Sequence, residues 1–550
     1  MSLRQHRNHF FLALGLLAAI TLSPAAVAKP SAKQTARRVD RLLAEEVFTA
    51  ETKLAPRIND ATFLRRAWLD IVGDIPTPEH VTAFLLDPAK DKRERAVREL
   101  LANPQYGQNW ARYWRDVILS RRLEDRAAIV ANPLVADLTE KLNDNQSWNT
   151  IAAEFIAATG DVKENGATAI LIAQDGRTEE SAAEVSRIFL GIQIQCCQCH
   201  DHPYDDWKRE QFHELAAFFP RVAVRPVLSP TRRTLEVIAD DRPKTRRRGN
   251  ANAEGRRGEA EHYMPDLDDP AAPGTRIQPK FFLTAADLPF GTRDAERRGT
   301  IAEWITENPW FATALVNRMW AELVGEGFYE PIDDIGPDRE PSAPKTVELL
   351  SRSFAESGYD VKWLFRVISA TEAYQRESRP RRDVEGTPFV ANVAQPLRSD
   401  QLFNALLTAI DVEEPAEPLN RRGRPPMAGA YGRAPTIRTA FEVAFGYDPS
   451  DPRETVTSSI QQALAMMNGV RINQAVRAIE DETILGRLLE EIHEDEPLIE
   501  ELYLRTLSRQ PTEDELNIAL EFCQATRNRT AVFEDLFWAL LNSSEFSHRR

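Results

Sequence analysis

Cysteine is scarce in this sequence, with only four residues in a chain of 550. So few thiols exclude a disulfide-stabilised scaffold, since such folds carry many cysteines in a short chain. Three of the four lie within four positions, at Cys196, Cys197 and Cys199, and this clustering indicates a chemical role. The fourth, Cys523, shares a helical face with apolar side chains and is predicted to be a buried core thiol.

The sequence also lacks several motifs that identify common enzymes and binding proteins. It has no glycine-rich phosphate loop, no Gly-x-Ser-x-Gly elbow and no complete His-Glu-x-x-His zinc pattern. Basic residues are outnumbered, with 69 Lys and Arg against 84 Asp and Glu, which gives a formal net charge of −15. An acidic surface disfavours nonspecific binding to nucleic acid and anionic lipid, so no nucleic-acid partner is expected.

The only long apolar run lies near the N-terminus. Arg4 and Arg7 precede an apolar run at 10–22, and small residues at 26–28 have the spacing of a cleavage site. This pattern predicts a cleaved signal peptide at residues 1–28 and a periplasmic or secreted mature protein with no transmembrane segment. The alternative is an uncleaved membrane anchor, which is disfavoured because the run is short for a full span.

Helical periodicity of apolar residues dominates the mature chain and predicts a mainly α fold. A chain of this length is expected to form more than one domain. We expect an N-terminal helical domain at 29–220 and a C-terminal helical domain at 294–550. Between them, residues 221–293 are rich in Pro, Arg and Asp and are predicted to be an extended connection with a few short strands.

Capping residues predict the starts of two helices. Thr512 and Glu515 form a capping-box pattern at the start of a C-terminal helix. Ser181 and Glu184 fit a second capping box, which predicts a helix from Ser181 to about Ile194. The cysteine cluster directly follows this second predicted helix.

The cysteine cluster contains the pattern Cys-x-x-Cys-His at Cys196, Cys199 and His200. Two thiols at this spacing can form thioethers with the two vinyl groups on one edge of a haem, and the adjacent imidazole can bind the iron. The sequence therefore predicts one covalent haem c per chain, held by Cys196 and Cys199, with His200 as the axial iron ligand. Candidates for the sixth iron ligand are His213, His262, Met264 and Met319.

The residues after the motif are candidates for supporting roles. Asp201 or Asp205 can orient a histidine through a hydrogen bond, or each can cap a turn. Trp207 can pack on a porphyrin or in the protein core. His202 lies too close in sequence to reach the opposite face of the same haem.

Three other chemistries are compatible with the same residues. Cys196 and Cys199 can form a local disulfide, or they can act as a redox dithiol. A zinc ion can bind these two cysteines together with His200 and His202, although four ligands would then crowd into seven residues. The predicted cofactor is haem c, with zinc or no cofactor as the alternatives.

Longer motifs over nearly all of the mature chain carry a family resemblance. In the first half they are Arg65-Arg66-Ala67-Trp68-Leu69-Asp70, Ile75-Pro76-Thr77-Pro78-Glu79, Trp110-Ala111-Arg112 and Cys199-His200-Asp201-His202-Pro203-Tyr204-Asp205. In the second half they are Asn308-Pro309-Trp310-Phe311-Ala312, Val316-Asn317-Arg318-Met319-Trp320, Gly358-Tyr359-Asp360-Val361-Lys362-Trp363-Leu364 and Leu540-Leu541-Asn542-Ser543-Ser544-Glu545-Phe546. Together they resemble the planctomycete-type cytochrome-associated family, in which domain of unknown function 1549 is followed by domain of unknown function 1553.

The resemblance implies an exported bacterial protein with a predominantly helical fold and a single Cys-x-x-Cys-His. It implies no particular activity. Related chains often carry a histidine after Pro-Ser, whereas here Pro341-Ser342 is followed by Ala343-Pro344. Cys197 is an addition to the plainer pattern and leaves open which thiols react.

These observations support one leading function and two alternatives. The leading hypothesis is an exported c-type haem protein that transfers electrons or supports haem-based redox chemistry with an exported redox or surface partner. One alternative is a haem-free interaction or scaffold protein whose cysteine cluster forms a disulfide or zinc clip. The other is an extracytoplasmic enzyme that acts on a surface or sulfated polysaccharide. No catalytic residue is assigned from the sequence.

Overall fold

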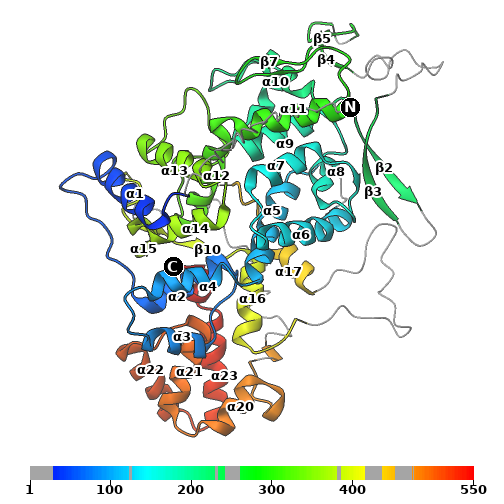
Figure 1. Ribbon diagram of the computed structural model, residues 1–550. Helices are drawn as coiled ribbons and strands as arrows, with labels where there is room; N and C mark the ends of the chain where they lie inside the picture. Colours follow the sequence, from blue (N-terminus) through cyan, green and yellow to red (C-terminus); the bar gives the residue numbers. More distant parts are fainter. Residues whose placement is uncertain are drawn as a thin grey trace, which may run out of the picture.

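The fold is that of a computed structural model, which describes residues 29–122, 127–228, 233–241, 261–269, 271–380, 386–414, 437–451, 473–474 and 476–550. The predicted signal peptide at 1–28 lies outside these residues. The described part is predominantly helical, with only short strands, as the sequence predicts (Figure 1). The domain boundaries at 220 and 294 stay predictions.

The first half of the chain consists mainly of helices (Figure 1). They are α1 (Ala32–Glu46), α2 (Asp60–Ile71), α3 (Pro78–Leu86), α4 (Lys92–Leu100), α5 (Gln105–Leu119), α6 (Ala127–Asn143), α7 (Trp148–Ala157), α8 (Ala169–Ala173), α9 (Thr178–Leu190) and α10 (Arg209–Ala216). Short 3-10 helices lie at η1 (Gly166–Thr168) and η2 (Ile194–Gln198).

Short strands occupy the predicted connecting segment. They are β2 (Val222–Leu228), β3 (Arg233–Ala239), β4 (His262–Met264), β5 (Thr275–Ile277), β6 (Lys280–Phe281) and β7 (Ala286–Asp287). The pairs β2–β3, β4–β5 and β6–β7 are antiparallel, and β1 (Gly160–Asp161) adds a third strand beside β3.

The second half is again helical, with two further strand pairs. Its helices are α11 (Asp294–Glu307), α12 (Pro309–Val324), α13 (Pro344–Glu356), α14 (Val361–Ala370), α15 (Glu372–Gln375), α16 (Ser399–Ala409), α17 (Ile437–Phe445), α20 (Ile484–Glu491), α21 (Asp495–Leu507), α22 (Glu513–Ala525), α23 (Arg529–Leu541) and α24 (Ser544–Ser547), with a 3-10 turn η5 (Glu480–Glu482). Strands β8 (Ser378–Arg379) and β9 (Asn392–Val393) pair in parallel, whereas β10 (Gln395–Pro396) and β11 (His548–Arg549) are antiparallel.

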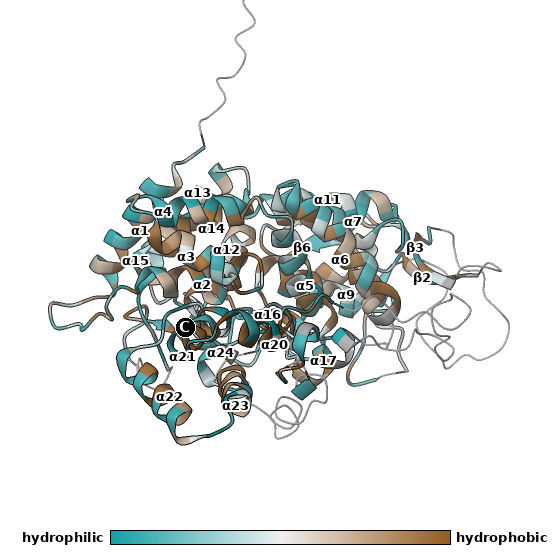
Figure 2. Cartoon of the chain, turned by 90° about the horizontal axis from the view of Figure 1, so that it is seen from below, coloured by the Kyte–Doolittle hydropathy of each residue, from teal (hydrophilic) through white to brown (hydrophobic). Residues whose placement is uncertain are grey.

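Two large hydrophobic clusters hold these helices together, and both draw on both halves of the sequence. The larger one combines α1, α5, α7 and α9 with α11 to α14. The smaller one packs α16 and α20 to α23 against Leu69 and Ile75 near the end of α2. In the cartoon coloured by hydropathy, hydrophobic residues gather between the helices and hydrophilic residues dominate the outer parts (Figure 2). The two halves are therefore not separated by a polar boundary.

The helix starts show where local sequence signals are sufficient. Thr512 and Glu515 form the predicted capping box at the start of α22. The capping box at Ser181 and Glu184 was wrong, because α9 begins earlier, at Thr178, and both residues lie inside the helix. Glu184 instead binds the buried Arg187 guanidinium.

The end of α9 and the position of Cys523 also differ from the sequence expectation. The helix ends at Leu190 rather than near Ile194, because Gly191 takes a positive φ of 68°. Cys523 packs against the smaller hydrophobic cluster but is only half-buried. Among the described residues, no helix combines the length and apolar character that crossing a lipid bilayer requires.

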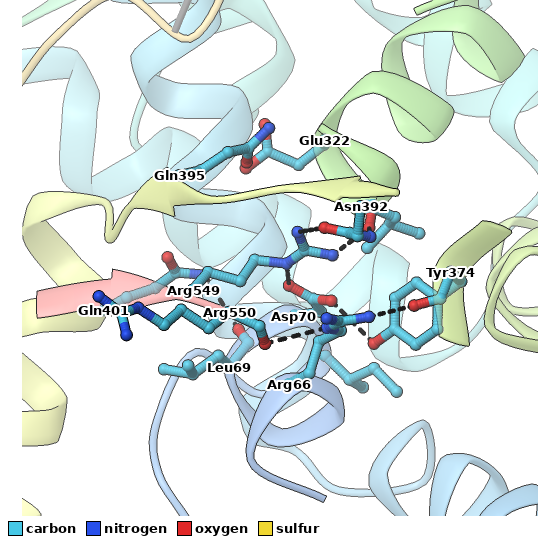
Figure 3. Close-up of polar contacts among 12 residues, drawn as sticks. Arg66, Leu69, Asp70, Glu322, Tyr374, Asn392, Gln395, Gln401, Arg549 and Arg550 are labelled. Carbon is cyan, nitrogen blue, oxygen red and sulfur yellow. Dashed lines mark hydrogen bonds and ion pairs between the residues drawn. The ribbon is translucent and has the colours of Figure 1, made fainter. Parts of the chain in front are cut away.

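A buried polar network ties α2 to the last strand, β11 (Figure 3). The Asp70 carboxylate accepts hydrogen bonds from Arg549 Nε and, at 2.8 Å, from the Tyr374 hydroxyl. Arg66 donates from Nε to the Arg550 carbonyl at 3.1 Å and from Nη1 to the carbonyl of Tyr374. Asp70 and Arg549 are both buried, so this ion pair is removed from water.

We expect Asp70→Asn to destabilise the protein by roughly 3–5 kcal/mol, because it leaves the buried Arg549 charge without its anionic partner. Urea unfolding followed by circular dichroism measures this change. The control is Glu94→Gln, which breaks the exposed Lys33–Glu94 pair at 2.7 Å and should change stability by less than about 1 kcal/mol. Equal small effects of the two substitutions would contradict the structural role of the network.

Candidate haem-attachment site

A buried charge cluster fixes the helix that leads into the cysteine motif. The Asp333 carboxylate accepts a hydrogen bond from Arg187 Nη1 of α9 at 3.0 Å and another from Arg318 Nη2 of α12. Glu184 binds the same Arg187 guanidinium from the other side, with Oε2 at 2.6 Å from Nη2. All four side chains are almost fully buried. Since buried charges are tolerated only when they are paired, α9 has little freedom to shift relative to α12.

The chain then turns sharply at Gly191 against residues from the second half. The Gly191 carbonyl accepts a hydrogen bond from Ile335 N at 2.8 Å, and Ile192 forms an isolated β-bridge with Asp334. A Cβ atom at position 191 would lie 2.7 Å from Ile335 Cδ1. The positive φ and this close approach both require glycine here. The loop that carries the cysteines therefore begins at Gly191, whose backbone position is fixed by these contacts.

The three clustered cysteines differ in exposure. Cys196 and Cys199 are exposed on and just after the turn η2, whereas Cys197 is buried. The Cys197 thiol lies 3.6 Å from the Trp207 carbonyl oxygen, which also accepts a hydrogen bond from His202 N at 2.8 Å. Burial, together with the neighbouring Cys196 and Asp201 charges, raises the pKa of Cys197 to about 12. Cys197 is therefore a protonated, enclosed thiol near neutral pH.

His200 is exposed beside Cys199, and its ring is oriented by the backbone. Its Nδ1 atom lies 2.7 Å from the Asp201 carbonyl oxygen. A carbonyl can only accept, so Nδ1 carries the proton, and in the neutral imidazole Nε2 keeps its lone pair. This is the arrangement in which histidines commonly bind metals, with the second ring nitrogen donating to a carbonyl or carboxylate.

The predicted supporting residues stabilise the loop rather than the imidazole. The Asp201 carboxylate accepts a hydrogen bond from Arg209 N at 2.9 Å, which caps α10. Asp205 is buried, and its Oδ1 accepts from Asp206 N at 2.8 Å and from Asp338 N at 3.2 Å. A Cβ atom at Gly336 would lie 1.5 Å from Asp205 Oδ2, so only glycine fits beneath this carboxylate.

His202 and Trp207 complete the fold of the loop. His202 is partly buried and accepts a hydrogen bond from Tyr204 N at Nδ1, at 3.4 Å. Trp207 is buried edge-to-face against Phe282 and Trp310, with ring centroids 5.3 and 5.8 Å away. Trp207 is therefore a core residue that anchors the loop.

Two of the four sixth-ligand candidates form a buried histidine pair. His213 Nδ1 lies 2.8 Å from His262 Nε2, and His213 Nε2 lies 3.1 Å from the carbonyl oxygen of Gln198 inside the motif. Because that carbonyl must accept, His213 is protonated at Nε2, and His262 donates to His213 Nδ1. The pair thus holds the cysteine turn against α10 and β4. Met319 is buried in α12, and Met264 is partly buried in β4.

We expect the free energy of unfolding to fall as the pH is lowered from about 6.5 toward 4. Burial lowers the pKa of His213 to about 4 and that of His262 to about 3, from an ordinary value of 6.5. The unfolded chain therefore binds more protons in this window, and each histidine contributes up to ~1.4 kcal/mol per pH unit.

Urea unfolding of the wild type and His213→Gln between pH 4.5 and 7.5 measures this dependence. Glutamine can still donate to the Gln198 carbonyl but does not titrate, so the variant should show a shallower slope. Substitution of the exposed His493 by Gln is the control and should leave the slope unchanged. An unaltered slope in His213→Gln would show that the pair does not titrate as expected.

Within the described ranges, no group of three or more His, Cys, Asp or Glu side chains is placed to hold a metal ion. Cys196, Cys199 and His200 are all exposed, and the haem, disulfide, dithiol and zinc hypotheses for them stay predictions. The Gln198–His213 bond and the role of Asp333 were missed, because no local sequence signal marks contacts between such distant segments.

Comparison with known families covers most of the described chain. Residues 38–224 match the sequence model PSCyt2, a protein of unknown function (DUF1549), and residues 297–523 match PSD1, a protein of unknown function (DUF1553). No curated protein and no solved structure shows significant similarity to the chain. The order of the two matches agrees with the resemblance found in the sequence motifs. The chain therefore belongs to the family in which a DUF1549 domain is followed by a DUF1553 domain.

Proposed function

We propose that this protein is an exported c-type haem protein, with haem attached at Cys196 and Cys199 and iron bound by His200. The observation that carries the proposal is the difference in exposure among the three clustered cysteines. Two thiols at the spacing of a haem-attachment motif are exposed, and the third is enclosed. In its neutral form the adjacent His200 imidazole presents an unprotonated Nε2, because its Nδ1 donates a hydrogen bond to the Asp201 carbonyl.

The residues of this loop are suited to covalent attachment of a haem. Thioether formation needs accessible thiols, which selects Cys196 and Cys199 over Cys197. The high pKa of Cys197, about 12, further disfavours its reaction because the thiolate is the reactive form. Haem iron, when bound, exchanges single electrons, which suits electron transfer or haem-based redox chemistry.

The position of the loop supports a reaction with a partner protein. Cys196, Cys199 and His200 are all exposed, and Tyr204 beside them is 78% exposed. Attachment at exposed thiols favours exchange of electrons with an exported partner at the surface. Export itself rests on the predicted signal at residues 1–28.

We expect Cys196→Ser and Cys199→Ser to abolish covalent haem when combined, and Cys197→Ser to leave it intact. The reason is that only the first two sulfurs can reach a group at the surface. Each variant is produced with haem-attachment machinery and measured by intact mass and by the pyridine haemochrome spectrum. Cys197→Ser is the matched control, since it changes the same atom in the same turn.

A wild-type protein with no added tetrapyrrole, despite competent maturation, would falsify the haem proposal. Titration of its thiols would then identify the alternative. Two reactive thiols that form a bond with each other support a redox dithiol or a disulfide clip, for which the exposed Cys196 and Cys199 are the candidates.

We expect His200→Ala to retain attached haem but to shift its absorption spectrum, since the thioethers remain and the axial imidazole is lost. His202→Ala is the matched control, because that ring is partly buried two residues away and is not predicted to bind iron. Spectra of the oxidised and reduced forms are compared. An equal shift in the two variants, or none in His200→Ala, would remove His200 from the iron.

A further inference from the structure

Arg112, on α5, is a mostly buried arginine whose side chain forms no hydrogen bond with the part of the chain that the structure describes. The residue is only 9% exposed. Among the described residues, no carboxylate, carbonyl or hydroxyl oxygen lies within hydrogen-bond distance of its five N–H donors. Buried charges in folded proteins are normally paired, so this side chain is an exception that needs a physical reason.

The carboxylates around Arg112 are occupied by other arginines. Arg115 binds Asp116 at 2.8 Å and Glu442 Oε2 at 2.9 Å. Asp400 is bound by Arg398, with Nε at 3.1 Å from Oδ1. Arg112 is thus surrounded by completed ion pairs and takes no part in them.

The facing helix α17 contributes further unsatisfied groups. Arg438 uses Nε and Nη2 to bind Glu414, both at 2.8 Å, but its Nη1 is buried without a hydrogen-bond partner. Glu442 Oε1, one turn along the same helix, is also buried without a partner. These two atoms form a long ion pair at 3.7 Å, without a direct hydrogen bond between them.

The Arg115–Glu442 pair joins α5 to α17, and Arg112 and Arg438 each lie one helical turn from a member of this pair. Burial, followed by the positive charge of Arg438, lowers the pKa of Arg112, which agrees with two neighbouring guanidiniums. Arg438 also binds Asn404 of α16 at 2.7 Å, which holds its guanidinium in place.

We propose that Arg112 and Arg438 form a binding site for a small hydroxylated oxyanion between α5 and α17, with Glu442 accepting from the ligand hydroxyl. Two guanidiniums supply donors in the planar geometry that suits carboxylate, phosphate or sulfate oxygens. Glu442 Oε1 supplies an acceptor, which suits a ligand that also carries an O–H group, such as hydrogen phosphate or a sugar acid. The site is independent of the proposed haem function.

Directed hydrogen bonds, rather than a positive field, hold the ligand in this site. The surrounding four guanidiniums and five carboxylates leave one excess negative charge, so affinity for an anion depends on the unpaired donors. The four guanidiniums are those of Arg112, Arg115, Arg398 and Arg438, and the five carboxylates are those of Asp116, Glu322, Asp400, Glu414 and Glu442.

The test is calorimetric titration of the full mature chain with sodium phosphate, sodium sulfate and sodium glucuronate at constant ionic strength, with chloride as the reference salt. We expect saturable binding of at least one of the hydroxylated probes, phosphate or glucuronate, tighter than that of sulfate. Arg112→Gln should weaken this binding by at least about tenfold, since charge-assisted hydrogen bonds are lost. Arg352→Gln, at an exposed arginine of α13, is the control and should bind as the wild type does.

The melting temperature of ligand-free protein separates a binding role from a structural one. An arginine kept for a ligand contributes no pairing to the fold, so Arg112→Gln should melt at the same or a higher temperature than the wild type. Absence of saturable binding in the wild type, or unchanged affinity in Arg112→Gln, would overturn the proposal. Binding of sulfate with equal affinity would overturn the role given to the ligand hydroxyl and to Glu442.

Discussion

The position of the cysteine loop depends on the burial of the Asp333 carboxylate between two arginines. Arg187 comes from α9 in the first half of the chain, and Arg318 comes from α12 in the second. An unpaired charge in the interior is strongly destabilising, so the three side chains are expected to become buried together as the protein folds. The loop follows α9 directly, and its first residue is bonded to Ile335, two positions beyond Asp333. The second domain of the family therefore forms part of the site whose motif lies in the first.

The exposed Cys-x-x-Cys-His residues could be predicted from the sequence, whereas the buried contacts that support them could not. Cys196, Cys199 and His200 lie within five positions of the chain, and the chemistry proposed for them rests on this spacing. The contacts that support the loop are not local, since Asp205 meets Asp338 and His213 meets His262 across segments far apart in sequence. Residue spacing therefore predicts the candidate reactive groups, and only the tertiary structure identifies the contacts that support them.

The helices show the same division. Apolar periodicity predicted a mainly helical chain, and the Thr512 capping box was found where expected because that helix start is exposed and local interactions decide it. The start of α9 at Thr178 could not be predicted in this way. Glu184 has the right spacing for a cap, but burial beside Arg187 gives it a stronger partner, so tertiary contacts overrule the local signal. The unpaired Arg112 belongs to the same class, since nothing in its neighbouring sequence separates it from the paired Arg115.

The Asp70–Arg549 pair has a consequence for the order of events during synthesis. The two residues are 479 positions apart, and the Arg549 guanidinium also reaches Asn392 at 2.9 Å. A nascent chain that has already exposed α2 to solvent must keep Asp70 without this counter-charge until translation reaches residue 549. Contacts of such wide sequence separation form late in folding. Closure of this part of the interior must accordingly wait until residue 549 has been synthesised, and a polypeptide terminated before that arginine would leave Asp70 without this partner.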